Sequence, residues 1–323
     1  EREASYGRSQ FVLQFQLDTS LSDLQRFPLR LSDLVVMEVD DHAPEKIVWS
    51  QGAEYRIGDL PAVGFSGDYY HRPAFIHGEW LEFDGCVMFV DPSGKGMDET
   101  AYAIVAQLNG NLFVLEVGSF REGYTEPVLE GLAQAAKRQE VNLIILEDQF
   151  GQGMLQSLLQ PYLRRIYPCT VEPARSNVQK ERRIINALEP VMNQHRLIVN
   201  RSVIENDSKA KDEDSVETHL AYQLFHQLTH LTVDRNSLQH DDRLDALAGA
   251  VEYWNDSLAI DEEIAMRERD MELLDLEIAA YNGEIVGALD ATILGIPLDE
   301  LPQSETEEGW IELQGFENQS LGN

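Results

Sequence analysis

Apolar residues form short, dense runs between residues 87 and 146 of the chain. Val87–Val90 and Asn142–Leu146 are almost continuously apolar, which is typical of strands buried on both faces of a sheet. Between them, Ala101–Leu108 and Leu112–Val117 flank Asn109-Gly110, a dipeptide that favours a two-residue hairpin turn. We therefore expect a central strand, then a hairpin, then a second buried strand.

Helical spacing of apolar residues follows the hairpin and recurs toward the C-terminus. Thr125 is a suitable N-cap, Pro127 falls in the first turn, and an apolar face repeats from Val128 to Ala136. The pattern predicts further helices over 154–166, 178–193, 216–228 and 241–254, and further short strands over 35–39, 47–49 and 169–172. Three antiparallel strands followed by parallel strands and helices indicate an α/β sheet of mixed direction.

Composition narrows the class of protein. A chain of 323 residues with 43% hydrophobic residues can bury a sizeable core, and its apolar runs are too short to span a bilayer. Cys86 and Cys169 are the only cysteines, which argues against a disulfide framework or a cysteine-rich zinc site and fits a reducing, cytosolic setting. The first residues lack the pattern of a signal peptide and there is no initiator Met, so we interpret the start as a domain boundary.

The net charge of −32 is unfavourable for binding nucleic acid, but it is unevenly distributed. Residues 256–323 hold 18 acidic residues against Arg267 and Arg269, so half of the excess, −16, lies in the last 68 residues. The charge of the whole chain therefore says little about the field at a local site. Six basic residues crowd into one stretch of 20 residues: Arg164, Arg165, Arg175, Lys180, Arg182 and Arg183.

Two carboxylates follow the buried strands directly. Asp91 ends the run 87–90 and Glu147 ends the run 143–146, and strand ends in open α/β sheets are where sites gather. If the strands are neighbours, the two anions repel unless one is protonated or a cation bridges them. Hard oxygen ligands suit Mg²⁺ or Mn²⁺, and the glycine-rich loops 93–96 and 150–153 would let a ligand approach closely. Alternatively, each acid only caps a turn or a helix.

A third group of acids opens the last predicted helix. Asp242 and Asp245 are three residues apart and share a helix face, and Asp241 is adjacent. A solvated first turn stabilised by the helix dipole would also explain one or two acids here. The small apolar residues from Ala246 to Ala250 suit a helix packed flush against a sheet, which would bring the first-turn acids to the strand ends.

The three acidic motifs resemble the nuclease domain of large terminase subunits, the DNA-packaging motors of tailed phages, and especially the short-tailed type. They are Val-Asp91-Pro-Ser-Gly, Leu-Glu147-Asp-Gln-Phe-Gly-Gln-Gly and Asp242-Arg-Leu-Asp245-Ala-Leu-Ala. The last motif also resembles RuvC-type Holliday-junction resolvases. Residues 6–23 resemble the segment that joins the motor's ATPase domain to its nuclease, so the resemblance covers roughly residues 1–258.

The resemblance implies an RNase H-like fold, a mixed sheet flanked by helices, and two-metal cleavage of double-stranded DNA with Mg²⁺ or Mn²⁺. Asp91 would bridge both metals and Glu147 would bind one. Asp245 and Asp242, in that order of preference, would complete the catalytic set, with Asp241 able to replace Asp242. Residues expected to bind DNA phosphates, unless they form a solvated helix face, are Arg175, Lys180, Arg182 and Arg183, with Lys95 on the loop after Asp91.

The resemblance also implies partners and a division into domains. The large terminase subunit carries an ATPase, yet the chain has no Gly-x-x-x-x-Gly-Lys-[Ser/Thr] motif. We expect residues 1–80 to be a linker leading in from a missing ATPase domain, 81–258 the nuclease domain, and 259–323 an acidic tail that docks on the portal or masks a basic DNA groove. The implied partners are double-stranded DNA, the portal or procapsid, the small terminase subunit and the ATPase domain of the same subunit, with no membrane. The expected location is the host cytoplasm, transiently at the procapsid portal.

Two alternatives remain open. A RuvC-like junction resolvase would use the same chemistry but prefer a four-way junction to linear duplex. A non-catalytic docking module of the packaging motor would use its acids only to cap helices, and it would not cut plasmid DNA with any metal.

Overall fold

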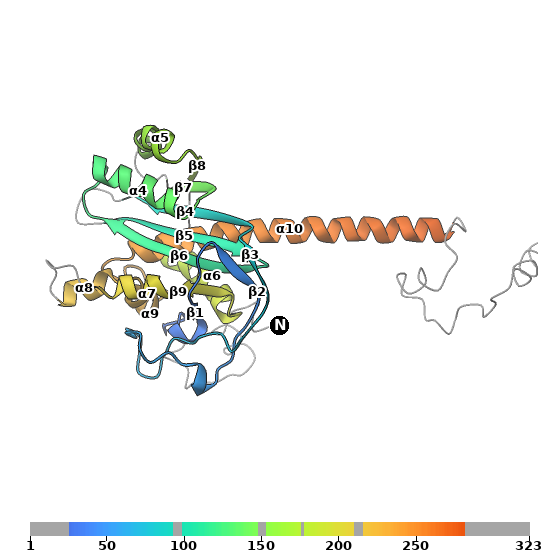
Figure 1. The fold of residues 1–323 in the computed structure, drawn as a ribbon, viewed down its shortest axis with the longest axis horizontal. Helices are drawn as coiled ribbons and strands as arrows, with labels where there is room; N and C mark the ends of the chain where they lie inside the picture. The colour runs from blue at the N-terminus through green and yellow to red at the C-terminus, as the bar shows by residue number, and fades with distance from the viewer. Residues whose placement is uncertain (1–25, 93–98, 148–152, 176–177, 210–215, 282–323) are drawn as a thin grey trace, which may run out of the picture. The chain divides into compact units, whose positions relative to one another are not determined.

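A seven-stranded mixed sheet lies at the centre of the fold (Figure 1). The computed structural model describes residues 26–92, 99–147, 153–175, 178–209 and 216–281. From one edge to the other the strands are β1 (Val35–Met37), β9 (Leu197–Asn200), β6 (Asn111–Phe120), β5 (Thr100–Leu108), β4 (Gly85–Asp91), β7 (Leu143–Glu147) and β8 (Thr170–Ala174). β4, β5 and β6 pair antiparallel, whereas β7 and β8 extend the sheet in parallel from β4, and β9 and β1 extend it in parallel from β6.

The predicted hairpin joins β5 to β6. Leu108 pairs with Asn111, and the two residues between them, Asn109 and Gly110, have φ angles of 51° and 76°. Positive φ at both central residues matches the right-handed twist of the strands, which is why Asn-Gly is favoured in this turn. The predicted hairpin is confirmed, and with the strand pairing above so is the predicted sheet of mixed direction.

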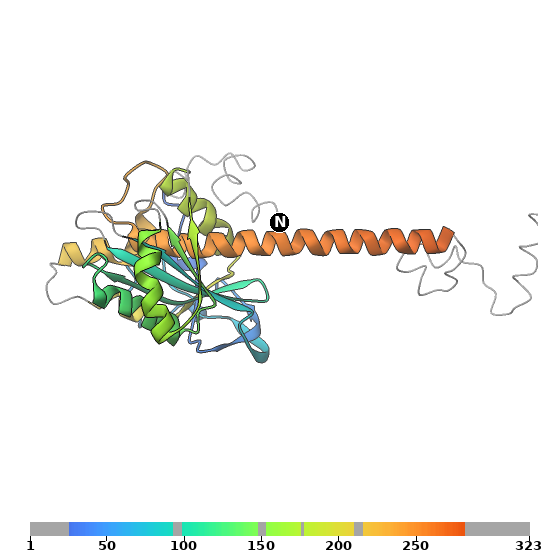
Figure 2. The ribbon, with the colours of Figure 1, turned by 90° about the horizontal axis from the view of Figure 1, so that it is seen from above.

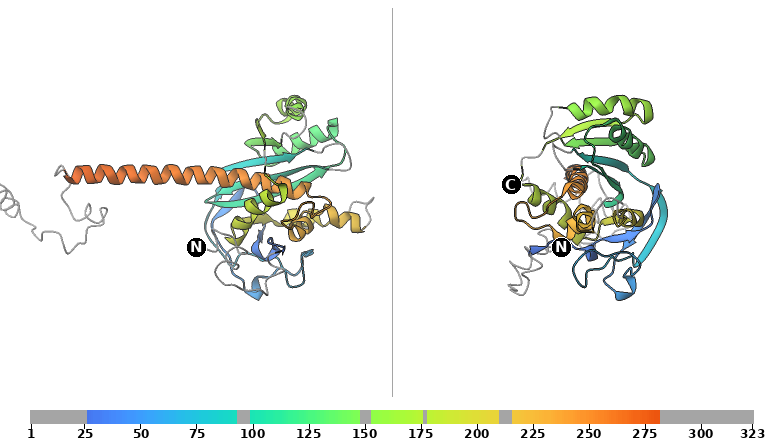
Figure 3. Two further views of the ribbon diagram at one scale, coloured as in Figure 1. Left: turned by 180° about the vertical axis from the view of Figure 1, so that it is seen from behind. Right: turned by 90° about the vertical axis from the view of Figure 1, so that its left-hand side faces the viewer.

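Alternate residues of the strands face two separate cores. On β4, Val87 and Phe89 face one core, and Met88 and Val90 face the other. The Phe89 core is covered by α6 (Lys180–Asn193), α7 (Arg201–Asp207), α9 (Leu224–His230) and the first turns of α10 (Asp242–Tyr281), and the Met88 core by α4 (Glu126–Arg138) and α5 (Met154–Ile166). Figure 2 looks from the α5 side, and the right panel of Figure 3 shows α4 and α5 on the opposite side of the strands from α6.

Helix α10 packs unusually close to β4 because Gly249 has no side chain. A Cβ atom at Gly249 would lie 2.5 Å from the ring of Phe89. Nearby, the indole of Trp254 donates a hydrogen bond to the carbonyl of Val105 on β5 (3.0 Å). Both contacts fix the beginning of α10 against the middle of the sheet.

Residues 26–84 contribute more to the core than the sequence indicated. β1 joins the edge of the sheet, and Leu31, Leu34 and Tyr70 are buried in the Phe89 core. The same region contains two short 3₁₀ helices, η3 (Leu31–Asp33) and η4 (Ala53–Tyr55), and a separate two-stranded sheet of β2 (His42–Val48) and β3 (Phe75–Glu82). β3 was not predicted, because Pro and Gly interrupt the pattern between residues 58 and 78.

One predicted helix is divided in the structure. The stretch 216–228 forms α8 (Val216–Tyr222) and α9, separated by Gln223, whose backbone is extended (φ −73°, ψ 129°). The carboxylate of Asp207 accepts hydrogen bonds from the backbone N–H groups of Leu224 (2.9 Å) and Phe225 (3.2 Å), so a residue from outside the segment caps α9. The last helix, predicted over 241–254, continues to Tyr281.

The chain divides into two compact units, residues 1–258 and 259–323. In the second unit the described residues, 259–281, are helical. Across the described ranges, no helix has the length and apolar character needed to cross a membrane.

Candidate metal centre

Asp91, Glu147 and Asp245 come together where β4 and β7 end and α10 begins. Each offers a carboxylate oxygen, and these three atoms all lie within 4.8 Å of one another. The side chains are buried, with exposed fractions of 6%, 4% and 0%. Three acids on three elements, far apart in the chain, therefore form one buried cluster.

Strand register explains why Asp91 and Glu147 meet. β4 and β7 are parallel neighbours, and Val90 pairs with Leu146, so the next residue on each strand is the acid. Because side chains alternate along a strand, Asp91 faces the same side as Phe89, and Glu147 the same side as Ile145. That side is the one covered by α6 and α10.

The first turn of α10 brings the third carboxylate. Asp245 N–H donates to the carbonyl of Asp241 (2.8 Å), which closes the turn. The preceding N–H, that of Leu244, donates to the side-chain carbonyl of Gln227 on α9 (3.1 Å). The start of α10 is thus capped by a side chain from a neighbouring helix.

Helix α6 places two cations inside this cluster. Lys180 Nζ lies 3.0 Å from Asp245 Oδ2, 3.0 Å from Asp241 Oδ1 and 3.7 Å from Asp91 Oδ2. Arg183 is 6% exposed and donates to Glu147 Oε1 (3.0 Å) and to Asp245 Oδ1. One guanidinium therefore holds two of the three clustered carboxylates side by side.

Burial sets the protonation behaviour of the cluster. It raises the pKa of Asp91 well above its usual value, and the charges of Asp245 and Glu147 add to this while Lys180 opposes it. Burial also raises the pKa of Asp245, against the opposing charges of Lys180 and Arg183. For Lys180, burial alone would lower the pKa, but the carboxylates outweigh it and the pKa is raised. The lysine therefore stays charged, and the three clustered carboxylates outnumber the two cations from α6.

The other two candidate acids lie at the edge of the cluster. Asp241 contacts Lys180, and Asp242 accepts a long hydrogen bond from the backbone N–H of Glu99 (3.4 Å). Neither belongs to the group of three whose ligand atoms converge. The charge of Asp242 still contributes to raising the pKa of Asp91.

The basic residues expected at DNA phosphates are placed differently from one another. Arg182 and Arg175 are exposed, whereas Lys180 and Arg183 point into the acids. Arg183 is therefore not part of a solvated helix face, the alternative that the sequence left open. Lys95 lies outside the described residues.

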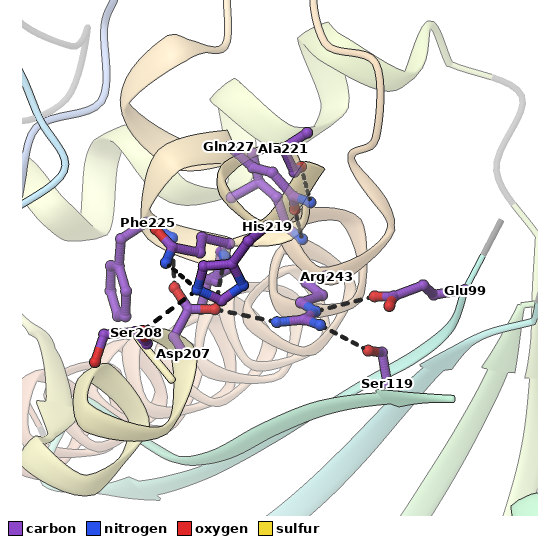
Figure 4. Close-up of polar contacts among 12 residues, drawn as sticks. Glu99, Ser119, Asp207, Ser208, His219, Ala221, Phe225, Gln227 and Arg243 are labelled. Atoms are coloured by element: carbon purple, nitrogen blue, oxygen red, sulfur yellow. Dashed lines mark hydrogen bonds and ion pairs between the residues drawn. The ribbon is translucent and has the colours of Figure 1, made fainter. Parts of the chain in front are cut away.

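A buried polar network beside the cluster was missed by the sequence interpretation. Arg243, next to Asp242 in α10, contacts Glu99, Ser119 and Asp207 (Figure 4). Its members are scattered over 145 residues, so no local pattern could have revealed it. The one usable signal was Arg243 itself, a cation between two acids in a helix whose next residues are apolar.

The chain is similar to known proteins over part of its length. The family model described as the ribonuclease H-like domain of the bacteriophage T7 terminase matches residues 90–197, so the predicted RNase H-like fold is confirmed. Two similar solved structures are a human cytomegalovirus terminase nuclease domain soaked with Mn and bound to an inhibitor, and the large terminase nuclease of thermophilic phage G20c. The first is 14% identical and covers 55% of this chain and 86% of that one, with a TM-score of 0.41. The second is 10% identical and covers 69% of this chain and 95% of that one, with a TM-score of 0.39.

A curated relative gives the family. The large terminase subunit of Enterobacteria phage T3 is 36% identical over 262 residues, which is 81% of this chain. The match covers 45% of the relative, so the chain spans about half the length of the relative. On this similarity, the chain belongs to the large-subunit family of phage terminases.

Proposed function

We propose that the chain is a metal-dependent endonuclease that cuts concatemeric double-stranded viral DNA during genome packaging. The observation that carries the proposal is the convergence of Asp91, Glu147 and Asp245 at the ends of two parallel strands. Membership of the large terminase family supports the same reaction. The RuvC-like resolvase and the docking module are kept as outcomes of the test.

The residues present fit a divalent cation. Three hard oxygen donors converge from three rigid elements, and burial disfavours their ionised forms unless a cation compensates. Mg²⁺ and Mn²⁺ both suit carboxylate ligands, and a pair of ions is the arrangement that we propose. Asp91 would bridge the pair, and Glu147, Asp245 and Asp242 would complete the set, with Asp241 as the substitute for Asp242.

The proposed reaction is hydrolysis of a phosphodiester, in which water forms a bond to phosphorus and the bond to the 3′ oxygen breaks. A divalent cation held by Asp91, Glu147 and Asp245 would supply Lewis-acid chemistry, polarising the phosphoryl oxygen and lowering the pKa of the water. Arg183 keeps Glu147 and Asp245 in a fixed relation, so the ligands are preorganised. Lys180 supplies a fixed positive charge beside Asp91.

The remaining parts of the proposal concern DNA and partners. Arg175 and Arg182, together with Lys95, are the proposed phosphate contacts, because cutting without sequence preference needs charge at the backbone. For Lys180 and Arg183, which contact the clustered carboxylates, we propose that their positive charge adds to the electrostatic attraction of DNA phosphates without direct contact. We propose residues 1–80 as the linker and entry segment, part of which also packs into the core of the nuclease domain as β1 and its neighbours. We propose residues 81–258 as the rest of the nuclease domain and 259–323 as the acidic tail. The proposed partners are the ATPase domain, the small subunit and the portal or procapsid, and the proposed location is the host cytoplasm, transiently at the procapsid portal.

Plasmid cleavage tests the proposal directly. Supercoiled plasmid is incubated with the chain in Mn²⁺, Mg²⁺ or EDTA, and nicked and linear forms are measured on gels. We expect cleavage with a divalent metal, none with EDTA, and at least a ~100-fold loss for Asp91→Asn, because loss of a metal-bound carboxylate removes charge stabilisation in the transition state.

The matched control is Asp59→Asn, which changes an exposed carboxylate paired with Arg201. It should cleave at the wild-type rate. No cleavage by the wild type with any metal would leave the docking module as the explanation. A strong preference for four-way junctions over linear duplex would favour the resolvase.

A further inference from the structure

Arg243 extends from α10 to three partners on other elements of the fold. Its guanidinium donates through Nε to Glu99 Oε2 (3.1 Å), through one terminal nitrogen to Asp207 Oδ1 (3.2 Å), and through the other to Ser119 Oγ (2.9 Å) (Figure 4). All three nitrogens of the planar guanidinium donate a hydrogen bond, and this arrangement fixes the orientation of the side chain as well as its distance from each partner.

The partners of Arg243 are themselves held in place. Glu99 is 1% exposed, and its other oxygen accepts from Arg121 Nε (2.9 Å). The side chain of Asp207 is 8% exposed, and it caps α9 through Leu224 and Phe225. The guanidinium therefore connects α10 to the residue before β5, to β6 and to the end of α7.

Helix geometry links this network to the metal centre. Successive residues of an α-helix are rotated by about 100°, so Arg243 and Asp245 point to nearly opposite sides of α10. Fixing Arg243 on one side therefore fixes the rotation of the helix that directs Asp245 on the other. Glu99 also helps to hold α10 in this rotation, because its backbone N–H donates to Asp242 in the first turn of the helix (3.4 Å).

The energetics favour a directional role over a stabilising one. Removing charged groups from water costs nearly as much free energy as their mutual attraction returns, so a buried ion pair adds little net stability. Orientation at a metal site, by contrast, depends on such supporting contacts, and their loss typically costs 10–100-fold in metal affinity. Arg243 resembles such orienting contacts, because its side chain is only 13% exposed and hydrogen-bonds to three partners.

We propose that Arg243 is a positioning residue: its bonds to Glu99, Asp207 and Ser119 set the rotation of α10 and so hold Asp245 against Asp91 and Glu147. This inference rests on the proposed function, since it assigns the carboxylates to metal binding. The contacts of Arg243 are with Glu99, Asp207 and Ser119 and not with the three clustered acids, so it acts through the orientation of the helix.

Arg243→Lys tests the proposal, because lysine keeps the charge but loses the three-sided fork. Binding of Mn²⁺ alone, without DNA, is measured by titration calorimetry on the purified chain. We expect at least a ~10-fold weaker affinity for the variant. In plasmid cleavage, the half-saturating Mn²⁺ concentration should rise, whereas the rate at saturating Mn²⁺ should stay near that of the wild type. A merely structural role would not produce this separation.

The matched control is Arg138→Lys, which changes an arginine paired with Glu116 on the other face of the sheet. Its Mn²⁺ affinity should equal that of the wild type. Ser119→Ala provides a milder variant, because it removes one hydrogen bond and leaves both ion pairs of Arg243. It should fold even if Arg243→Lys does not, and it should bind Mn²⁺ about twofold to fivefold more weakly, as loss of one hydrogen bond implies.

The outcomes separate the two proposals. If the wild type binds Mn²⁺ and cleaves DNA but Ser119→Ala and every folded Arg243 variant bind Mn²⁺ equally well, only the positioning role is overturned. If the wild type binds no Mn²⁺, the metal centre itself fails and the positioning role fails with it. Weaker binding in Arg138→Lys would also overturn the proposal, because the effect would then be unspecific.

Discussion

Lys180 Nζ lies 3.0 Å from Asp245 Oδ2, within the acid cluster. The same nitrogen is 3.7 Å from Asp91 Oδ2, so one ammonium serves two of the carboxylates proposed to bind metal. Since those carboxylates raise the pKa of Lys180, the charge persists at neutral pH. A metal ion and this lysine therefore compete for the same negative charge.

Replacing Lys180 should tighten metal binding. In Lys180→Met the stem is kept and the positive charge is lost, so a divalent cation meets less repulsion. We expect binding of Mn²⁺ to strengthen at least about fivefold at pH 7.5, because two unit charges about 4 Å apart interact by about 1 kcal/mol even in bulk water. Calorimetric titration measures this, and Arg182→Met, which removes an exposed cation two residues away, is the control. Weaker binding in Lys180→Met would show that the lysine supports the metal.

Replacing Arg183 should destabilise the fold more than replacing its neighbour. Arg183→Met leaves Glu147 and Asp245 buried without their guanidinium partner, which we expect to cost about 3 kcal/mol of unfolding free energy. Urea unfolding measures the loss. Arg182→Met should leave the unfolding midpoint nearly unchanged. Millimolar Mn²⁺ should restore part of the stability of Arg183→Met, because a ligand that binds only the folded state stabilises it.

Adding a methyl group at Gly249 should separate α10 from the sheet. Alanine is the better helix former by about 1 kcal/mol, but its Cβ would meet the buried ring of Phe89 at 2.5 Å. Overpacking typically costs about 1–3 kcal/mol, so we expect Gly249→Ala to be less stable and to bind Mn²⁺ more weakly, since Asp245 moves with the helix. Gly58→Ala, where the added Cβ meets nothing within 4 Å, is the control. Equal stability and affinity in the two variants would contradict the close-packing argument.

Glu116 should contribute stability that is lost in acid. Burial alone would raise its pKa, but hydrogen bonds from Arg138, Tyr102 and Gln139 outweigh it and the pKa is lowered. A lowered pKa means that the folded state favours the charged form, so the contribution is present above the unfolded pKa and disappears as pH falls through the folded pKa.

The Glu116→Gln variant measures that contribution. At pH 7 we expect its unfolding free energy to be about 1 kcal/mol below that of the wild type, a value reduced by solvent screening at Arg138. The difference should shrink progressively below about pH 4.5, where the unfolded carboxyl begins to protonate. Glu130→Gln, which alters an exposed carboxylate 3.5 Å from Arg165, is the control and should change the unfolding free energy at pH 7 by less than about 0.5 kcal/mol. A difference that stayed constant down to pH 3 would contradict the lowered pKa.

The sequence indicated some features of the tertiary structure and not others. In α6, Arg183 is four residues before Ala187, which is buried, so helical periodicity already placed it on the apolar face. Interpreting Arg183 as a DNA contact passed over that spacing in favour of its charge. Gln223 divides the stretch 216–228 because Asp207, remote in sequence, caps the following N–H groups, and no property of residues 216–228 indicates it.

Local patterns along the chain determined the central strands, the Asn109-Gly110 hairpin and the acids at the strand ends, because side-chain alternation and turn geometry act over a few residues. The tertiary structure decided which acids meet. Parallel pairing of β4 with β7 joins Asp91 to Glu147, and the contact of Gly249 with Phe89 brings Asp245 within reach. It also decided which acids Lys180 and Arg183 contact and that Arg243 joins Glu99 and Asp207. These contacts link residues up to 160 positions apart, as for Gly249 and Phe89, and they depend on packing between elements, which periodicity within one element does not encode.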